Sequence, residues 1–269
     1  AEDLAADVGV TILSNVDAQD AGIHNLGLAD ASGTADALTV TLQGTNGAAD
    51  NGTDNDIEDI AFTNIETLNL VSSHAGTTAL ASTDWNEVAD ISTDTVLTAL
   101  NVSGSDRIKM TVGSEATNLA TLDASAATGD NTYTVSATGN VAVTTGTGDD
   151  TIAMGSTLTN GDTIDGGAHG TAATDGDMLQ ATITSNTTTT AAITVANVEY
   201  FEFTNTGTAY VNAAGITGAS ADLTVTGAST KTTYSNLGAI HTVGLGHKDE
   251  GGASNTGITV LGLADATGT

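Results

Sequence analysis

The sequence contains no cysteine and no proline, and it has very few basic residues. Without cysteine the chain can form no disulfide bond, no zinc–thiolate site and no cysteine nucleophile. Its 33 Asp and Glu residues face only four Lys and Arg, which gives a net charge of −29. This charge repels nucleic acids and anionic membrane surfaces, so both are excluded as partners. A long apolar run is also missing, so we expect no membrane insertion.

Salt bridges to four basic residues cannot neutralise this many carboxylates. Divalent cations such as Ca²⁺ prefer oxygen ligands and would screen the charge. A solvated acidic surface of the halophile type is the alternative. The 269 residues and the hydrophobic fraction of 39% are sufficient for a buried core, so the charge does not imply disorder. The absence of an initiator Met and of a signal peptide predicts a mature product or a segment of a longer protein.

Most of the chain alternates apolar residues with Thr or Ser, as β-strands with one buried face do. Clusters of Gly, Asn, Asp and Ser separate these segments and favour turns. The best helix signal is STDWNEVAD (82–90), where Ser82 or Thr83 would cap a short helix of about two turns. The predicted strands are residues 37–42, 66–71, 131–137, 140–145, 180–185, 191–196, 200–204 and 222–227.

Two segments share the template L-x-x-L-[N/D]-x-S at an offset of 22 residues, LTALNVS (97–103) and LATLDAS (119–125). The segment IETLNLVS (65–72) carries a similar core. A period near 22 residues corresponds to one coil of a parallel β-helix, in which each strand stacks on its counterpart in the next coil. We therefore predict an all-β fold, a parallel β-helix or β-roll-like solenoid with irregular β ends and at most one short helix.

Composition divides the chain into three β-rich segments: residues 1–90 with an acidic loop, residues 91–180 with coil-like repeats and acidic glycine turns, and residues 181–269. The stretch LGLADASGT (26–34) returns as LGLADATGT (261–269). Either the chain covers slightly more than one period of a tandem array, with the next repeat starting near 261, or both stretches are terminal turns of one solenoid. We favour the array.

The stretch TGTGDDTIA (145–153) matches the β-roll repeat G-G-x-G-x-D-x-U-x, where U is a large apolar residue, except at Thr145. In such turns glycine permits the tight backbone, and carbonyl and Asp oxygens bind Ca²⁺ between neighbouring turns. The element D-x-[I/L] recurs at 150–152, 162–164 and 177–179, with spacings of 12 and 15 that require looped-out insertions. These turns predict bound Ca²⁺, with acidic turns free of metal as the alternative.

The run ADNGTDNDIEDI (49–60) is a second candidate for a calcium site. It lacks the spacing of an EF-hand loop, so the prediction is an irregular calcium loop, with a solvated loop tip as the alternative. The candidate ligands in this run are Asp50, Asp54, Asp56 and Asp59.

The acidic glycine turns at 144–179, the T-L-N-L strands after an I-E or V-E step (Ile65–Glu66, Val198–Glu199) and the stretch LDASAATG (122–129) resemble the repeats-in-toxin surface proteins of Gram-negative bacteria. Within that family the likeness is to calcium-dependent surface-layer proteins. Residues 36–230 share the general strand and turn composition of these proteins, and residues 144–179 share their repeat motif. The resemblance implies type I export, folding on contact with calcium outside the cell, and assembly into lattices or fibres. It also implies the ion ligands Asp149, Asp150, Asp162, Asp165, Asp175 and Asp177.

Signals for catalysis are weak. None of the five His residues lies in H-E-x-x-H or beside a G-x-S-x-G elbow. A polysaccharide lyase would need a basic residue as proton acceptor, but Arg107 and Lys109 lie on a predicted strand, where we expect them to pair with local carboxylates. Trp85 is expected to cap the end of the apolar stack, and residues 200–203 to form core or a contact between subunits.

The sequence therefore predicts a structural protein rather than an enzyme. We expect a self-assembling extracellular protein at the cell surface, a surface layer or filament stabilised by Ca²⁺. Its partners would be further copies of itself and cell-surface polysaccharide. A calcium-stiffened segment of a large adhesin is the alternative, and a secreted polysaccharide lyase is the second alternative.

Overall fold

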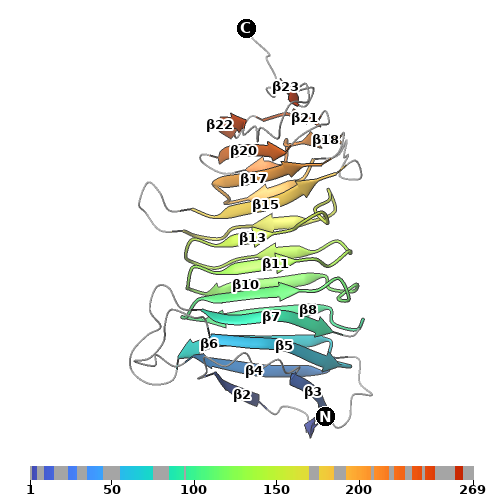
Figure 1. Ribbon diagram of the computed structural model, residues 1–269, viewed down its shortest axis with the longest axis vertical. Helices are drawn as coiled ribbons and strands as arrows, with labels where there is room; N and C mark the ends of the chain where they lie inside the picture. The colour runs from blue at the N-terminus through green and yellow to red at the C-terminus, as the bar shows by residue number, and fades with distance from the viewer. Residues whose placement is uncertain are drawn as a thin grey trace, which may run out of the picture.

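The computed structural model is a rod of β-strands that stack from the N-terminal to the C-terminal end (Figure 1). It describes residues 2–4, 9–14, 24–28, 35–44, 55–74, 85–93, 95–169, 176–184, 192–206, 209–217, 221–227, 232–237, 240–245 and 258–262. The described strands form three sheets in which every pairing between strands is parallel. The predicted all-β, solenoid-like fold is confirmed, and the eight predicted strands overlap strands of the structure.

Successive strands alternate between two long sheets, which we call sheet A and sheet B. Sheet A has eleven strands: β1 (Glu2–Leu4), β3 (His24–Leu28), β5 (Asn55–Thr63), β7 (Asn86–Thr93), β9 (Ile108–Val112), β11 (Thr132–Val135), β13 (Thr151–Ala153), β15 (Met178–Ile183), β17 (Tyr200–Asn205), β20 (Ala221–Gly227) and β22 (Ile240–Leu245).

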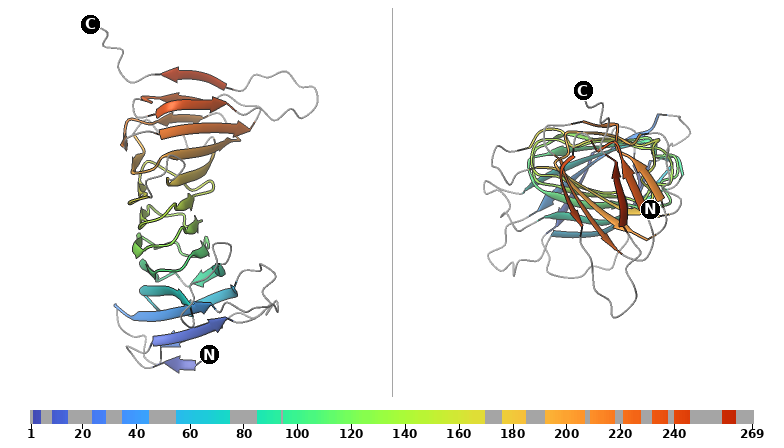
Figure 2. Two further views of the ribbon diagram at one scale, coloured as in Figure 1. Left: turned by 90° about the vertical axis from the view of Figure 1, so that its left-hand side faces the viewer. Right: turned by 90° about the horizontal axis from the view of Figure 1, so that it is seen from above.

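Sheet B has nine strands: β2 (Gly9–Ser14), β4 (Ala37–Gly44), β6 (Thr67–His74), β8 (Ala99–Gly104), β10 (Thr121–Ala127), β12 (Ala142–Thr144), β14 (Thr163–Asp165), β16 (Thr194–Ala196) and β19 (Ile216–Thr217). Near the C-terminal end, β18 (Ala209–Asn212), β21 (Thr232–Ser235) and β23 (Ile258–Gly262) form a third sheet. Viewed along the rod, the coils outline a flattened ring (Figure 2).

Stacked apolar side chains fill the interior, because each strand turns alternate residues inward. In β8, for example, Leu100 and Val102 are buried while the residues between them are partly exposed. The register puts like on like, since Leu100 pairs with Leu122 as the offset of 22 residues predicts. In sheet B one buried column runs through Leu38, Leu68, Leu100, Leu122, Val143, Ile164, Val195 and Ile216.

The predicted helix at residues 82–90 is wrong where the structure describes it. Residues 86–93 form β7, which pairs with β5 and β9 in sheet A. Val88 and Ile91 are buried in the interior, and Asn86 is buried at the start of the strand. Tertiary packing of these side chains therefore overrides the local capping signal. The remaining part of the stretch, residues 82–84, lies outside the described residues.

The three predicted segments share the two long sheets, since β7 pairs with β9 across residue 90 and β15 pairs with β17 across residue 180. Of the duplicated stretches, residues 26–28 belong to β3 and residues 261–262 to β23, and the rest lie outside the described residues. The array therefore stays a prediction. Phe201 and Phe203 are buried and pack edge to face at 5.9 Å, as expected for core.

Candidate functional site

The turn that carries the β-roll motif lies at one corner of the rod, where the chain passes from sheet B to sheet A. We call the turn residues 128–131, 145–150, 166–169, 176–177 and 197–199 the acidic corner. Glycine is required here because adjacent turns approach closely. A Cβ on Gly146 would collide with the carbonyl oxygen of Ala127, and one on Gly148, which has φ +133°, would lie 2.6 Å from the Gly129 carbonyl oxygen.

Polar side chains form a ladder along this corner, each immediately before a strand of sheet A. Each uses one oxygen to accept a hydrogen bond from a backbone N–H of the preceding coil. The acceptors are Asn131 from Ile108 N at 3.0 Å, Asp150 from Asn131 N at 2.8 Å, Asp177 from Asp150 N at 2.8 Å and Glu199 from Asp177 N at 2.9 Å. Three carboxylates thus stand on consecutive coils, with neighbouring strands about 4.8 Å apart.

A second row of carboxylates lies outside this ladder. Asp149 N donates to Asp130 Oδ1 at 3.0 Å, and Gly176 N donates to Asp149 Oδ1 at 3.0 Å. Asp130 is exposed and Asp149 is half-buried. The two rows therefore concentrate carboxylates along four successive turns. Glu199 Oε1 lies 3.5 Å from His169 Nε2, which gives this end of the ladder a cationic partner when the His is protonated.

Asp177 is the carboxylate of the ladder with the least favourable surroundings for a negative charge. Its side chain is 0% exposed, and its Oδ2 has no hydrogen-bond partner among the described residues. Burial, the largest cause, and the charges of Asp150, Glu199 and Asp149 together raise the pKa of Asp177 to about 8, against the hydrogen bond from Asp150 N. Burial also raises the pKa of Asp150 to about 6, although hydrogen bonds from Asn131, Gly146 and Thr145 oppose that shift. Within the described residues neither carboxylate forms an ion pair.

The unpaired oxygen of Asp177 faces the neighbouring turn at Gly166. A Cβ on Gly166 would lie 2.9 Å from Asp177 Oδ2 and would collide with the carbonyl oxygen of Asn197. Asn197 adopts φ +52° and donates from Nδ2 to Asp165 Oδ1 at 2.8 Å. A carboxylate oxygen and a carbonyl oxygen therefore approach one glycine without a side chain between them. Carboxylate and carbonyl oxygens are the ligand types that Ca²⁺ prefers.

Asp162 lies at the opposite corner, where the chain passes from sheet A to sheet B. Its Oδ1 accepts from Val141 N at 2.8 Å, and its Oδ2 accepts from Thr159 N at 2.7 Å. Both oxygens are thus occupied, Oδ1 by a hydrogen bond from the residue before β12 and Oδ2 by one within the turn that precedes β14. The spacings of 12 and 15 are half-coils, since Asp150 and Asp177, a full coil of 27 residues apart, return to the same corner.

The structure therefore brings together only part of the predicted ligand set. Asp149, Asp150 and Asp177 meet at the acidic corner, and Asp165 lies beside them at the end of β14, where its Oδ1 also accepts from Gly167 N. Glu199 belongs to the same ladder and was missed, because V-E before a strand does not match D-x-[I/L]. Asp50, Asp54 and Asp175 lie outside the described residues.

The second predicted calcium loop is only partly a loop. Residues 55–60 belong to β5, in which Asp56 pairs with Glu87 and Asp59 with Asp90 of β7. In the part of the chain that the structure describes, no three His, Asp or Glu side chains are grouped so as to hold a metal ion. An ion at the acidic corner would therefore need backbone carbonyl oxygens or water among its ligands.

Closer to the N-terminal end, the same corner is held by neutral or paired groups, which we call the paired corner: residues 72–74, 85–86 and 105–107. His74 Nδ1 lies 2.8 Å from Asp106 Oδ2, and Asn86 Nδ2 donates to Ser72 Oγ at 2.9 Å. The Arg107 guanidinium stacks over the Trp85 ring at 3.6 Å. The expectation that Trp85 caps the end of the apolar stack is wrong, because coils lie on both sides of β7.

Arg107 and Lys109 are engaged on the surface of the rod. Lys109 Nζ lies 2.6 Å from Glu87 Oε1, which confirms the expected pairing with a local carboxylate. Arg107 Nε instead donates to the backbone carbonyl of Asp130 at 3.2 Å.

Comparison with known proteins gives no match to a protein family, to a curated protein or to a solved structure. Among the described residues, no helix reaches the length and hydropathy needed to cross a membrane.

Proposed function

We propose that this chain is a structural segment of a self-assembling extracellular protein, a surface layer or filament, in which Ca²⁺ stabilises the acidic corner. The observation that carries the proposal is the carboxylate ladder of Asp150, Asp177 and Glu199, with a buried Asp177 oxygen that has no partner among the described residues. Like charges on adjacent coils repel one another, and a bound divalent cation converts that repulsion into attraction.

The oxygen chemistry of the corner fits calcium. The groups that would hold an ion are the unpartnered oxygen of Asp177, one neighbouring carboxylate of the ladder, either Asp150 or Glu199, the carbonyl oxygen of Asn197, and water. Bound Ca²⁺ would supply positive charge that holds successive coils together. Extracellular calcium modules have dissociation constants of about 10⁻⁴–10⁻³ M. At a tenfold excess of calcium each site adds roughly 1.4 kcal/mol to the free energy of unfolding.

A uniform parallel rod supports a structural role. Continuous sheets bury one apolar column through many coils, and the flat outer faces can lie against further copies of the chain. The location at the cell surface, type I export and contact with cell-surface polysaccharide come from the resemblance to repeats-in-toxin surface proteins. Because the carboxylates repel one another, the chain would stay loosely folded in a cytoplasm that contains little calcium. It would then be exported in that state and fold outside the cell.

Scanning calorimetry and electron microscopy of the 269-residue chain test the proposal. We expect millimolar Ca²⁺ to raise the melting temperature by about 3 °C or more for each occupied site. Equal Mg²⁺ should give a smaller rise, because Mg²⁺ demands a stricter octahedral geometry. Lattices or fibres should form with calcium and dissolve in chelator. An unchanged melting temperature in chelator would contradict the calcium part of the proposal.

The same images separate the alternatives. Monodisperse rods that bind calcium without assembling would favour a stiffened segment of an adhesin. Release of unsaturated sugars from a uronan would favour the lyase, for which Arg107 and Lys109 are the nearest basic pair in sequence.

A further inference from the structure

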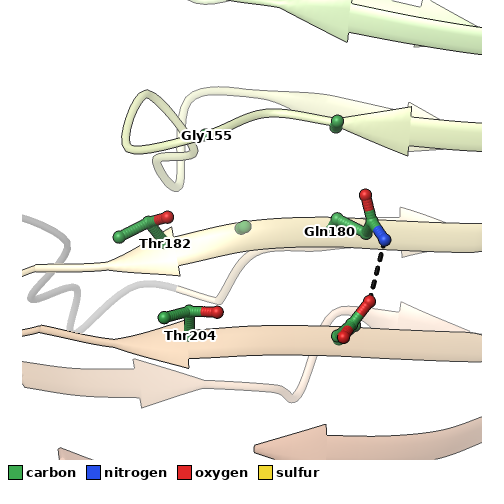
Figure 3. Close-up of a pocket in the computed structure, with 7 residues that line it drawn as sticks. Gly155, Gln180, Thr182 and Thr204 are labelled. Atoms are coloured by element: carbon green, nitrogen blue, oxygen red, sulfur yellow. Dashed lines mark hydrogen bonds between the residues drawn. The ribbon is translucent and has the colours of Figure 1, made fainter. Parts of the chain in front are cut away.

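The outer face of sheet A has a hollow of about 290 Å³ between β13, β15 and β17 (Figure 3). Gln180, Thr182, Glu202 and Thr204 line it from β15 and β17, and Ala153 and Gly155 line it from the chain of β13. The hollow exists because β13 ends at Ala153, whereas β15 and β17 continue to Ile183 and Asn205. Small side chains on the β13 side leave the surface open there.

The four polar side chains stand at the corners of a rectangle. Gln180 pairs with Glu202 and Thr182 with Thr204, so the short side is the strand spacing of about 4.8 Å and the long side, two residues, is about 6.6 Å. Gln180 Nε2 donates to Glu202 Oε2 at 2.8 Å, which holds both side chains in place. In Figure 3 the Gln180 amide oxygen points toward β13, and the hydroxyl oxygens of Thr182 and Thr204 point toward the end of the hollow where Gln180 lies.

These groups define the ligand that the hollow would take. The Glu202 carboxylate and the Gln180 amide oxygen accept hydrogen bonds, and the Thr182 hydroxyl can donate or accept. The Thr204 hydroxyl lies 3.2 Å from Thr226 Oγ1 and keeps capacity for a further hydrogen bond. The six lining residues named above include no cationic side chain, so an anionic ligand meets only repulsion. A ligand with several hydroxyl donors around a ring matches the set, and one pyranose unit has a comparable size.

We propose that this hollow binds a neutral pyranose unit, with its hydroxyl groups donating to Glu202 and Gln180 and exchanging hydrogen bonds with Thr182 and Thr204. The inference locates the polysaccharide contact of the proposed surface protein. The sugar site itself does not depend on the proposed function. Only the natural source of the sugar, a cell-surface polysaccharide, rests on that function. Because the hollow is open and small, the dissociation constant should be in the millimolar range, about 1–10 mM.

The test is a titration of the isotope-labelled chain, followed by NMR chemical shifts, with the methyl glycosides of glucose, galactose and mannose and with galacturonate. At least one neutral glycoside should shift the signals of Thr182 and Thr204, and galacturonate should shift neither. Thr182→Val and Thr204→Val keep the side-chain shape, and each should weaken binding about fivefold. Thr132→Val, on the same face of sheet A at β11, should leave it unchanged.

Two further variants keep the proposal falsifiable. Ala153→Phe should fill the hollow and abolish the shifts while the rest of the spectrum stays that of the folded rod. Glu202→Gln should admit galacturonate, because the repelling charge is gone. The proposal is overturned if no neutral glycoside binds at about 100 mM, well above the expected constant. Equal binding to Ala153→Phe, or wild-type binding of galacturonate as tight as that of the neutral glycosides, also overturns it.

Oligosaccharides distinguish the two sources of sugar. Tighter binding of a neutral oligosaccharide than of its monomer supports a polysaccharide, whereas equal binding contradicts that source and assigns a free saccharide. Assembly is measured separately by electron microscopy. Sugar binding without lattices or fibres contradicts the proposed function alone, and lattices or fibres without sugar binding contradict the sugar site alone.

Discussion

The paired corner and the acidic corner are parts of one edge of the rod, but they differ in how charge is balanced between neighbouring coils. Charged side chains have partners at the paired corner, whereas carboxylates lie next to one another at the acidic corner. At the paired corner, buried Asp106 meets His74, Asn86 bonds Ser72, and Arg107 stacks on Trp85. At the acidic corner, Asp150 and Asp177 accept backbone N–H groups in the same way as Asn131, yet they bring charges that no base in the described residues offsets.

The comparison separates the geometric role of these side chains from their charge. An amide such as Asn131 accepts the same backbone hydrogen bond as a carboxylate. The ladder therefore does not need negative charge for its geometry. Placing acids on consecutive coils destabilises the bare rod at neutral pH and makes its stability depend on protons or cations. The paired corner should be indifferent to calcium.

The largest loss of stability should come from substitution of Gly146, the glycine that both the β-roll motif and the close stacking of the turns require. In Gly146→Ala the new Cβ collides with the Ala127 carbonyl, so we expect a loss of about 3 kcal/mol or more in the free energy of unfolding, with or without calcium. Denaturant unfolding measures it. Gly155→Ala is the matched control, because a Cβ there meets nothing within 4 Å and its φ of +52° costs only about 1 kcal/mol. Equal losses for the two variants would argue against close stacking of the turns.

Asp106→Ala should be the next largest change, and it tests the paired corner. It removes the partner of His74 from a site that is 5% exposed, so we expect a loss of about 1–3 kcal/mol that calcium does not restore. Asp123→Ala, which removes an exposed carboxylate of β10, should cost less than about 0.5 kcal/mol. Chemical denaturation measures both losses. If calcium restored the stability of Asp106→Ala, the two corners would not differ in their response to calcium, and the comparison would be contradicted.

Asp177→Asn should stabilise the rod rather than destabilise it, and the gain should depend on pH. The pKa of Asp177 is raised to about 8 in the folded chain and is about 3.9 when unfolded, so the wild-type rod loses stability as pH rises from about 4 to 8. Without calcium, the variant should melt higher than wild type at pH 8 and equally at pH 4. With calcium at pH 8 the advantage should vanish or reverse.

Asp162→Asn is the control for that experiment, because Asp162 lies at the opposite corner with both oxygens bonded. Its melting temperature should respond to calcium as that of wild type does. If the two variants respond alike in calorimetry, the acidic corner has no special sensitivity.

Much of this fold follows from the sequence because strand alternation and coil period are local and repeated. The template shared by LTALNVS and LATLDAS gave the register of Leu100 on Leu122. The helix prediction failed because its signal came from four or five local residues, whereas the burial of Val88 and Ile91 depends on strands far away in sequence.

The candidate site was harder to predict, because the sequence does not show which corner a turn occupies. Asp162 and Asp177 look alike in the D-x-[I/L] pattern, but an odd number of half-coils separates them. Glu199 belongs to a V-E step rather than to the D-x-[I/L] pattern, and it joins the ladder because it precedes β17 on the next coil. The spacing of 27 residues from Asp150 to Asp177 differs from the coil period near 22, and this hides the full-coil relation between them.

The smallest effect should come from Arg107→Lys. It keeps the charge but loses the planar stack on Trp85, so we expect a loss of about 0.5–1 kcal/mol, equal at pH 5 and pH 8. Urea unfolding at the two pH values measures it. A loss that grew with pH would link this residue to the acidic corner.

The most direct test of the central claim is an anomalous-difference map from crystals grown with Ca²⁺ or a lanthanide substitute. The account predicts a peak at the acidic corner, in contact with Asp177 and close to the Asn197 carbonyl, and no peak beside Asp162. A well-ordered map with Asp150, Asp177 and Glu199 free of any ion at neutral pH would contradict it.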